Sequence, residues 1–387
     1  MEVDATDSLS NWCNGSLPNA NTSTLRVYMR SSSSLFGCTW CPRLLSALRQ
    51  FAPPHVCWAA KRDASDLEIA HIDSYFDVDF VLDNRNAKSP PFIVLQHSYH
   101  MSKDDERVKF ARAWARSILL VSFNDLSEAA AKAQVVFHPM PWGTDSETFV
   151  PLAEAPSSEV TELYADSGND YRGHKYYSLN NSEPYVVIVG ATDLWWDGYG
   201  DIETHTEVLI AAARAGLRVR HLGDRHNVLC LCATPGSNNR DIIVQKSVCE
   251  PSAALGGKAA CDFHDNLGRV STKAYVEMIQ GARYVAALRK FEGFEMPAVE
   301  ALLCGVRPLV YRIQSYRWYG NHAVYIPSGL DSDQVTEEIY SKAFSKLPEP
   351  INQKELEALR QTFAWQTLVP TLFARAVEQI RVRRLDS

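Results

Sequence analysis

The sequence contains no long hydrophobic run. No stretch of about 18 apolar residues occurs among its 387 residues, so no membrane-spanning helix is expected. The first residues, MEVDATDSLSNWCNGS, lack the cationic region and apolar stretch of a secretory signal. The nine cysteines are an odd number and lack the dense pairing of disulfide-rich secreted domains. These absences predict a cytoplasmic protein without a transmembrane segment.

Clear metal-binding and redox patterns are also missing. One segment holds five residues of zinc-binding type without the paired C-x2-C spacing of structural zinc modules: Cys230, Cys232, Cys249, Cys261 and His264. Whether this segment binds a metal stays open from sequence. Cys38 and Cys41 lie between an expected strand and an expected helix, as in thioredoxin-type motifs. An ordinary βα loop explains them better, because nothing else is typical of that small fold.

The charge balance argues against a broad surface for polyanions, since the formal net charge is −7. The predicted helix over 103–117 nevertheless carries five cations mixed with acidic residues: Lys103, Arg107, Lys109, Arg112 and Arg116. Mixed charges are more typical of a salt-bridged helix face. Peripheral contact with an anionic membrane surface is the alternative.

Length and composition predict two globular domains. A chain of 387 residues is too long for one ordinary core, and 46% hydrophobic with 22% charged residues is typical of globular proteins. Strands are expected at 25–29, 55–59, 77–82, 91–96, 118–122, 134–138, 185–189, 219–222, 284–288 and 308–311. Helices are expected at 42–51, 104–115, 203–215, 272–281, 297–304, 355–362 and 368–384. Alternating strands and helices predict an α/β fold with parallel sheets.

The most informative segment is FEGFEMPAVEALLCGVRPLV, at 291–310. Glu292 follows the apolar run 284–288 and so lies on the loop at the carboxyl end of a buried strand. Pro297 suits the first turn of a helix, and Gly305 suits its end. The loop presents free backbone N–H groups and the positive end of the helix dipole, which favour an anion. Glu300 on the same helix can bind a sugar diol, so the segment fits a nucleotide sugar.

This segment resembles the E-x7-E signature of family-4-type retaining glycosyltransferases, E-G-F-G-x-P-x-x-E-A-x-A-C-G-x-P. The matching residues are Glu292, Gly293, Phe294, Pro297, Glu300, Ala301, Cys304, Gly305 and Pro308. Residues 141–151 are similar to the P-N-G-V-D-x-x-x-F-x-P that ends the first domain in this family. Residues 363–365 resemble its F-S-W. The three landmarks occur in the family's order.

The resemblance implies a GT-B fold, in which two Rossmann-like, doubly wound parallel-sheet domains face a cleft. We expect a flexible tail at 1–23, an acceptor-side domain at 24–152 that also takes the crossover helix 366–387, a linker at 153–183, and a nucleotide-sugar domain at 184–365. The implied activity is hexosyl transfer (EC 2.4) from a nucleotide-diphosphate sugar to a hydroxyl, with retention and without cofactor or obligatory metal. The acceptor stays open: glycan, lipid-linked molecule, protein or nucleic acid.

The family pattern also assigns roles to single residues. Glu292 holds donor-sugar hydroxyls and stabilises the oxocarbenium charge, Glu300 binds the ribose, and Gly293 and Phe294 offer backbone N–H groups. In the N-terminal domain, His97 follows an apolar strand where the family places a histidine that reaches the donor sugar, with His100 as the competitor. The first βα loop reads SSSSLFG, and its Gly37 is the candidate for close approach to the donor phosphates.

The largest departure from the family pattern follows Gly190. The family's G-R-x-x-x-x-K-G supplies two cations to the diphosphate, whereas this chain reads GATDLWWDG at 190–198. Arg225, Arg289 or Lys290 are the candidate replacements, and Lys290 is nearest to Glu292 in sequence. A second departure is Glu295, which replaces a small residue.

Other interpretations use the same residues. Asp77 and Asp79 resemble the D-x-D metal motif of the other large glycosyltransferase fold. The alternation of Phe76, Val78 and Phe80 instead predicts a strand with both carboxylates on its polar side. A non-catalytic protein that binds sugar nucleotides, or a GT-B epimerase or hydrolase, are the alternatives to a transferase.

Overall fold

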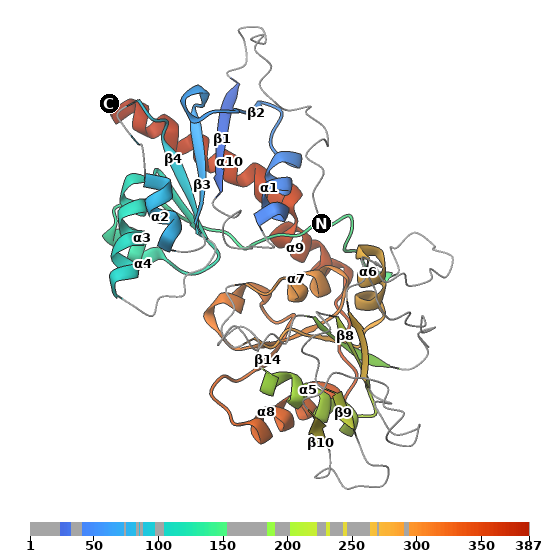
Figure 1. The fold of residues 1–387 in the computed structure, drawn as a ribbon. Coiled ribbons are helices and arrows are strands. Elements are labelled where there is room, and N and C mark those ends of the chain that lie inside the picture. The colour runs from blue at the N-terminus through green and yellow to red at the C-terminus, as the bar shows by residue number, and fades with distance from the viewer. Residues whose placement is uncertain are drawn as a thin grey trace, which may run out of the picture. The chain divides into compact units, whose positions relative to one another are not determined.

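The fold is described from a computed structural model of the chain. The structure describes residues 24–31, 41–72, 75–82, 85, 88–96, 104–152, 184–189, 202–222, 230–232, 243–245, 264–268, 271–289 and 294–386. The chain divides into two compact units (Figure 1). The N-terminal unit comprises Met1–Gly143 and Gln361–Ser387, and the C-terminal unit comprises Thr144–Arg360.

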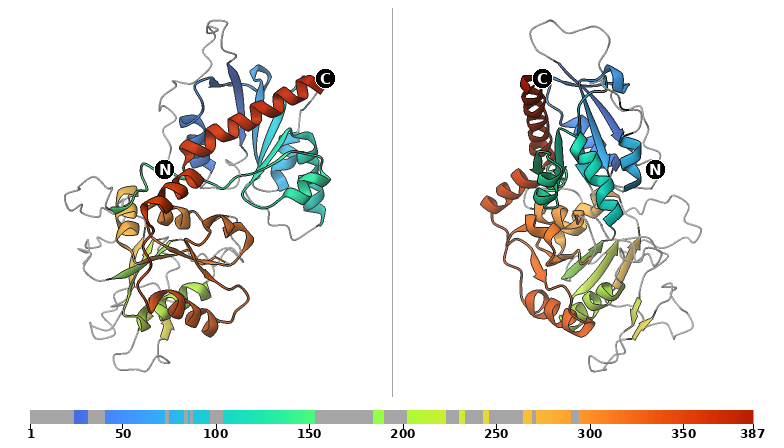
Figure 2. Two further views of the ribbon diagram at one scale, coloured as in Figure 1. Left: turned by 180° about the vertical axis from the view of Figure 1, so that it is seen from behind. Right: turned by 90° about the vertical axis from the view of Figure 1, so that its left-hand side faces the viewer.

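The N-terminal unit contains a parallel sheet of six strands. Across the sheet they are β2 (Val56–Trp58), β1 (Leu25–Ser31), β3 (Leu67–Ile72), β4 (Phe92–Gln96), β5 (Leu119–Ser122) and β6 (Phe137–Pro139). The helices of this unit are α1 (Cys41–Gln50), η2 (Arg62–Ala64), α2 (Tyr75–Leu82), α3 (Asp104–Arg116), α4 (Ser127–Lys132) and α10 (Trp365–Asp386). Figure 2 shows the long α10 running across this unit, and its Phe373 packs edge-on against Trp58 of β2.

The C-terminal unit contains a second parallel sheet of six strands. Across the sheet they are β11 (His264–Gly268), β8 (Arg218–Leu222), β7 (Tyr185–Val189), β12 (Tyr284–Ala286), β13 (Pro308–Tyr311) and β14 (Val324–Ile326). Counted along the chain, these strands have the order 3-2-1-4-5-6, which is that of dinucleotide-binding Rossmann folds.

The remaining elements of the C-terminal unit are helices and one strand pair. They are α5 (Ile202–Arg214), the antiparallel pair β9 (Cys230–Cys232) and β10 (Ile243–Gln245), α6 (Thr272–Gly281), α7 (Met296–Leu303), η6 (Gln314–Tyr319), α8 (Ser332–Ile339), the π-helical turn η7 (Tyr340–Phe344) and α9 (Gln353–Phe363). The last three residues of α9, 361–363, belong to the N-terminal unit. One core forms where β7 and β12 pack against α5 and α8, through residues such as Ile188, Leu209 and Ile339.

Most predicted elements are confirmed to within a few residues, and one prediction is wrong. The segment 77–82 is not a strand, because it belongs to helix α2. The strand of this region is β3, between β1 and β4. Its sequence LEIAHI contains Glu68 and His71, yet both are buried, so neither period-2 alternation nor a continuous apolar run marks it. The predicted polar side with both Asp77 and Asp79 rested on a strand, so it falls with that prediction.

Two landmarks of the sequence meet in the N-terminal unit. A Cβ atom added to Gly143 would lie 2.6 Å from the carbonyl oxygen of Phe363, and the rings of Trp142 and Trp365 are 6.4 Å apart. Any side chain at position 143 therefore collides with backbone at the end of α9. Contact between the segments 141–151 and 363–365 thus explains the glycine at position 143 and the tryptophans at 142 and 365.

The described residues contain no helix long and apolar enough to cross a bilayer. Cys57 of β2 is disulfide-bonded.

The buried Glu68 generates a test of the fold. Its Oε2 lies 2.6 Å from Nη2 of Arg85 and 3.7 Å from Nε of Arg62, and its side chain is fully buried. We expect Glu68→Gln to lower the free energy of unfolding by about 3 kcal/mol, because buried arginine charge then loses its counter-charge. Urea denaturation measures this change.

The matched control is Glu128→Gln. Glu128 also pairs with a cation, Lys132 at 2.7 Å, but it is fully exposed on α4. We expect no measurable change, because exposed ion pairs contribute little. Equal stabilities of the two variants would contradict the role assigned to Glu68.

Candidate active site at the carboxyl edge of the second sheet

The candidate site lies where the strand order of the second sheet reverses. β7 and β12 are parallel neighbours, with Val186 opposite Tyr284 and Ile188 opposite Ala286. The segments that follow the two strands leave the same edge of the sheet, although about 95 residues separate them in sequence. One begins at Gly190 and the other leads to Glu292, so the topology brings the starts of both predicted segments to one edge. Open parallel sheets bind ligands at such a point.

The structure describes two of the predicted site residues, Phe294 and Glu300. The others lie outside the described residues: Glu292, Gly293, Lys290, Gly190, His97 and Gly37. His100 and Arg225 also lie outside them, as do Cys249 and Cys261 of the cysteine-rich segment. No group of three or more potential metal ligands occurs within the described part of the chain.

Helix α7 is placed as the sequence predicts. Pro297 lies in its first turn, and Glu295 is its N-cap residue in extended conformation. At the other end Gly305 has φ +79°, the left-handed conformation that glycine adopts without strain. The N–H of Val306 donates to the carbonyl of Ala301 and that of Gly305 to Leu302, which is the Schellman pattern of helix termination. Nearly every side chain of α7 is buried.

Glu300 is a buried carboxylate in the second turn of α7. Its side chain is 2% exposed, and its Oε2 accepts a hydrogen bond of 2.5 Å from the hydroxyl of Tyr275 on α6. The Tyr275 ring packs edge-on against Phe149, so the donor is itself fixed. A buried carboxylate with one oxygen oriented by a tyrosine is suited to bind hydroxyl groups of a ligand.

Two tyrosines of η6 hold both ends of the segment that contains Glu292. The Tyr316 hydroxyl donates to the carbonyl of Arg289 at 3.4 Å, and the Tyr319 hydroxyl donates to that of Glu295 at 2.8 Å. Their rings stack with centroids 5.5 Å apart, and both are fully buried. The ends of this segment are therefore fixed by the fold. Sequence reasoning missed this contribution, because nothing in the pattern of η6 indicates which backbone atoms its tyrosines reach.

Phe294 anchors the segment through its side chain. It is 5% exposed and packs against Tyr319 with ring centroids 5.8 Å apart. The matching phenylalanine of the E-x7-E pattern thus has a packing reason here.

The two departures from the family pattern lie next to each other. Glu295 is 2% exposed, and its Oε1 lies 3.7 Å from Nε of Arg289, whose side chain is 28% exposed. Glu295 stands where the family has a small residue, and Arg289 is one of the candidate replacement cations. The buried carboxylate attracts the partly exposed guanidinium at ion-pair distance, beyond the range of a hydrogen bond, and this attraction favours a cation beside the start of α7.

Comparison with known proteins gives matches only among solved structures, since no protein-family profile and no curated sequence matches the chain. HepE from Anabaena, determined in complex with UDP and glucose, matches with a TM-score of 0.53 and 13% identity over 92% of this chain and 99% of that one. Sucrose-phosphate synthase from Thermosynechococcus elongatus matches with a TM-score of 0.49 and 13% identity over 82% and 74%. The N-terminal domain of trehalose-6-phosphate phosphatase from Candida albicans gives 0.47 and 9% over 90% and 76%.

The HepE match and the two parallel sheets confirm the predicted fold class. The chain has the α/β GT-B fold with two Rossmann-like domains. At 13% identity the match shows the fold alone.

Cys304 at the end of α7 tests the packing of this site. Burial raises the pKa of its thiol far above the ordinary range, and the nearby charge of Glu300 raises it further. Because the thiolate is the reactive form, we expect no alkylation of Cys304 by iodoacetamide at pH 8 in the folded protein and full alkylation in denaturant. Peptide mapping by mass spectrometry distinguishes Cys304 from the other cysteines.

Glu300→Gln is the control for this test. It removes the negative charge and leaves the burial, so Cys304 should stay unreactive in that variant. Rapid labelling of Cys304 in the folded wild type would contradict the buried position of α7.

Proposed function

We propose that the chain is a retaining glycosyltransferase that moves a hexosyl group from a nucleotide-diphosphate sugar to a hydroxyl acceptor. The observation that carries this proposal is the position of the E-x7-E segment. The described residues before this segment follow the carboxyl end of β12, at the reversal of a Rossmann-type strand order, and the described residues after it form the buried helix α7. The likeness to the family signature thus occurs at the sheet edge where a nucleotide is expected to bind.

The fold comparison supports the donor class. HepE contains UDP and glucose in its crystal structure, that is, a nucleoside diphosphate and a hexose. A nucleotide sugar combines both groups. The site of this chain offers the matching chemistry, since the start of α7 favours phosphate and the oriented carboxylate of Glu300 suits a ribose diol.

In the proposed reaction the bond between the anomeric carbon and the diphosphate oxygen breaks, and a bond to the acceptor oxygen forms on the same face of the sugar. The acceptor proton moves to the departing diphosphate. Glu292 holds sugar hydroxyls and stabilises positive charge on the ring, and Glu300 binds the ribose. Backbone N–H groups at Gly293 and Phe294 bind phosphate oxygens. Three further contacts to the donor remain predictions from the sequence: His97 and Gly37 of the N-terminal unit, and Gly190 of the C-terminal unit.

We propose further that Arg289 replaces at least one of the two cations that the family carries after Gly190. Arg289 lies between β12 and α7, its guanidinium is partly exposed, and the buried Glu295 holds it. A guanidinium beside the start of α7 stabilises the charge that develops on the leaving diphosphate. Lys290 stays the second candidate.

Binding without transfer, and epimerase or hydrolase activity, are the competing functions. The absence of the family's Arg/Lys pair favours binding without transfer. Arg289, paired with Glu295, is the cation proposed to replace part of that pair. No obligatory metal is part of the proposal. The cytoplasmic location stays a prediction.

The first test screens UDP-, GDP-, ADP- and CMP-sugars by thermal shift, because a ligand of the native state raises the melting temperature. We expect one nucleotide class to stabilise the protein, and the matching donor sugar to be transferred to hydroxyl acceptors. Donor consumed without any acceptor, giving free sugar or an epimer, would indicate a hydrolase or epimerase. Binding without turnover of donor or acceptor would indicate a non-catalytic protein.

Glu292→Gln tests the proposed catalytic role with the donor that the screen identifies. We expect turnover to fall by about 10²-fold or more, with unchanged melting temperature and unchanged affinity for the free nucleotide. Glu300→Gln should instead lower the affinity for the free nucleotide, because it changes the group proposed to bind ribose. Glu357→Gln, at an exposed position of α9, is the control that should change neither. Full activity of Glu292→Gln would remove Glu292 from the mechanism.

Arg289→Ala tests the replacement cation. We expect kcat to fall by about 10²-fold and nucleoside diphosphate affinity by about tenfold, since a charge-assisted contact to the leaving group is lost. Arg289→Lys should restore part of the activity because it keeps the charge. Arg312→Ala, at an exposed arginine beside Tyr325, is the control.

The variants of Arg289 also separate a catalytic from a structural role. If Arg289 acts only through its pairing with Glu295, Arg289→Ala will lower the melting temperature while affinity for the nucleoside diphosphate stays unchanged. That result would assign the cation to another residue.

A further inference from the structure

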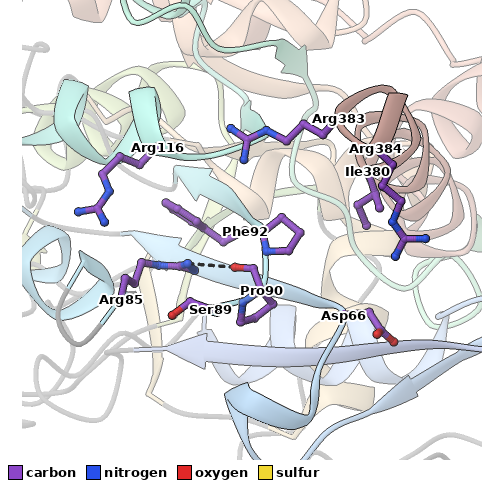
Figure 3. A pocket seen from close by; sticks show the side chains of 10 residues that line it. Asp66, Arg85, Ser89, Pro90, Phe92, Arg116, Ile380, Arg383 and Arg384 are labelled. Atoms are coloured by element: carbon purple, nitrogen blue, oxygen red, sulfur yellow. Dashed lines mark hydrogen bonds between the residues drawn. The ribbon is translucent and has the colours of Figure 1, made fainter. Parts of the chain in front are cut away.

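An arginine-lined hollow occurs in the N-terminal unit, at the edge of the sheet opposite the predicted donor contacts. Its volume is about 560 Å³, within the range of small-molecule sites. Its lining comes from the residue before β3, the start of β4, the end of α3 and the last turns of α10: Asp66, Arg85, Ser89, Pro90, Pro91, Phe92, Arg116, Ile380, Arg383 and Arg384. Figure 3 shows these side chains.

The position of the hollow separates it from the predicted donor site. Phe92 is the first residue of β4, whereas His97 follows its last residue, Gln96. The strand between them spans about 15 Å. A ligand in the hollow therefore lies at the amino edge of the sheet and not at the carboxyl edge, where the reaction is proposed to occur.

The hollow has a net positive charge. Two charged residues of its lining, Arg85 and Asp66, are each neutralised by an ion-pair partner. Arg85 pairs with the buried Glu68 at 2.6 Å. Asp66 accepts hydrogen bonds from Arg26 at both carboxylate oxygens, at 3.0 and 2.8 Å, and this pairing holds the pKa of Asp66 below its ordinary range. The remaining charged groups of the lining are cations: Arg116, Arg383 and Arg384.

Cations crowd one another around Arg85. Burial lowers the pKa of Arg85, and Glu68 opposes that effect. The other contributions all lower the pKa and come from neighbouring positive charges: Arg62, Arg30 and Arg116. Such an arrangement costs free energy in the empty protein, and an anion relieves it.

The lining combines a rigid base with cations that are accessible from solvent. The Arg85 guanidinium lies 3.8 Å from the centre of the Phe92 ring and donates to the carbonyl of Pro90 at 3.1 Å, as the dashed line in Figure 3 shows. Arg116 and Arg383 are exposed. Neither forms an ion pair with a carboxylate among the residues that the structure describes. In the view of Figure 3, both are drawn above Ser89.

We propose that this hollow binds the phosphoryl group of a small phosphate ester or diphosphate, at a second site independent of the donor site. Arginine forks match the oxygens of a phosphoryl group and bind it with charge-assisted hydrogen bonds. Arg116 and Arg383 supply these contacts from two elements far apart in sequence. The ligand thereby joins the end of α10 to the sheet.

Isothermal titration calorimetry of the full chain with pyrophosphate tests the proposal. We expect binding that weakens as ionic strength rises. The double variant Arg116→Gln/Arg383→Gln should bind pyrophosphate at least about tenfold more weakly, because two charge-assisted contacts are lost. The matched control is Arg112→Gln/Arg381→Gln, which removes the same charge from exposed positions of the same two helices outside the hollow and should bind like the wild type.

Arg289→Ala separates this site from the donor site, where pyrophosphate is also expected to bind. In a two-site isotherm, the hollow component should weaken only in the Arg116/Arg383 variant and the donor component only in Arg289→Ala. Pyrophosphate binding that Arg289→Ala abolishes and the Arg116/Arg383 variant retains would overturn the second site and leave the proposed function intact. Equal loss in the control variant would also overturn it, since net charge alone would then explain binding.

Vesicle sedimentation identifies the source of the phosphoryl group. Phosphatidylcholine vesicles with and without phosphatidic acid provide a phosphomonoester on a lipid surface. Binding to the phosphatidic acid vesicles that depends on Arg116 and Arg383, without binding of free pyrophosphate, would assign the hollow to a lipid headgroup. Binding of free pyrophosphate alone would assign it to a soluble phosphate. No binding in either experiment would overturn the proposal.

Discussion

The parallel pairing of β7 with β12 is the constraint on which the candidate site depends. These strands are neighbours because the chain adds β8 and β11 on one side of β7 and then returns to build β12, β13 and β14 on the other. Backbone hydrogen bonds between them fix the register, with Val187 opposite Val285. The segments that follow the two strands therefore start from the same edge of the sheet. In this way the fold brings two distant parts of the sequence to one edge. A different strand order would separate the carboxyl ends of β7 and β12.

Hydrogen bonds and buried charges then shape that edge. The two tyrosines of η6 hold the carbonyl groups at both ends of the segment containing Glu292, and Tyr275 orients Glu300. Glu295 brings a negative charge into a buried position and keeps Arg289 near it. Because a buried carboxylate without a cation is costly, the unusual glutamate and the nearby arginine are best understood as one feature.

The N-terminal unit uses the same physics at the opposite edge of its sheet. Glu68 on the central strand β3 is fully buried, and Arg85 and Arg62 approach its carboxylate. Several more arginines converge on this region from α3 and α10, so the local charge is positive although the chain as a whole has a net charge of −7. The patch of cations on 103–117 was ambiguous in sequence. Its last member, Arg116, acquires its surroundings from α10, more than 250 residues further along the chain.

The sequence by itself determined the α/β class, most of the element positions and the start and end of α7, because these depend on local patterns such as apolar runs, Pro297 and Gly305. One strand was misplaced from sequence. The polar residues Glu68 and His71 of β3 are typical of a surface segment, and only the tertiary structure shows that they are buried. Only the tertiary structure decided that Arg289 lies beside Glu295 and that two tyrosines of η6 hold the ends of the segment containing Glu292. It also decided that arginines of α3 and α10 surround one hollow. Contacts of this kind join residues distant in sequence, and a pattern along the chain contains no information about which side chains the fold brings together.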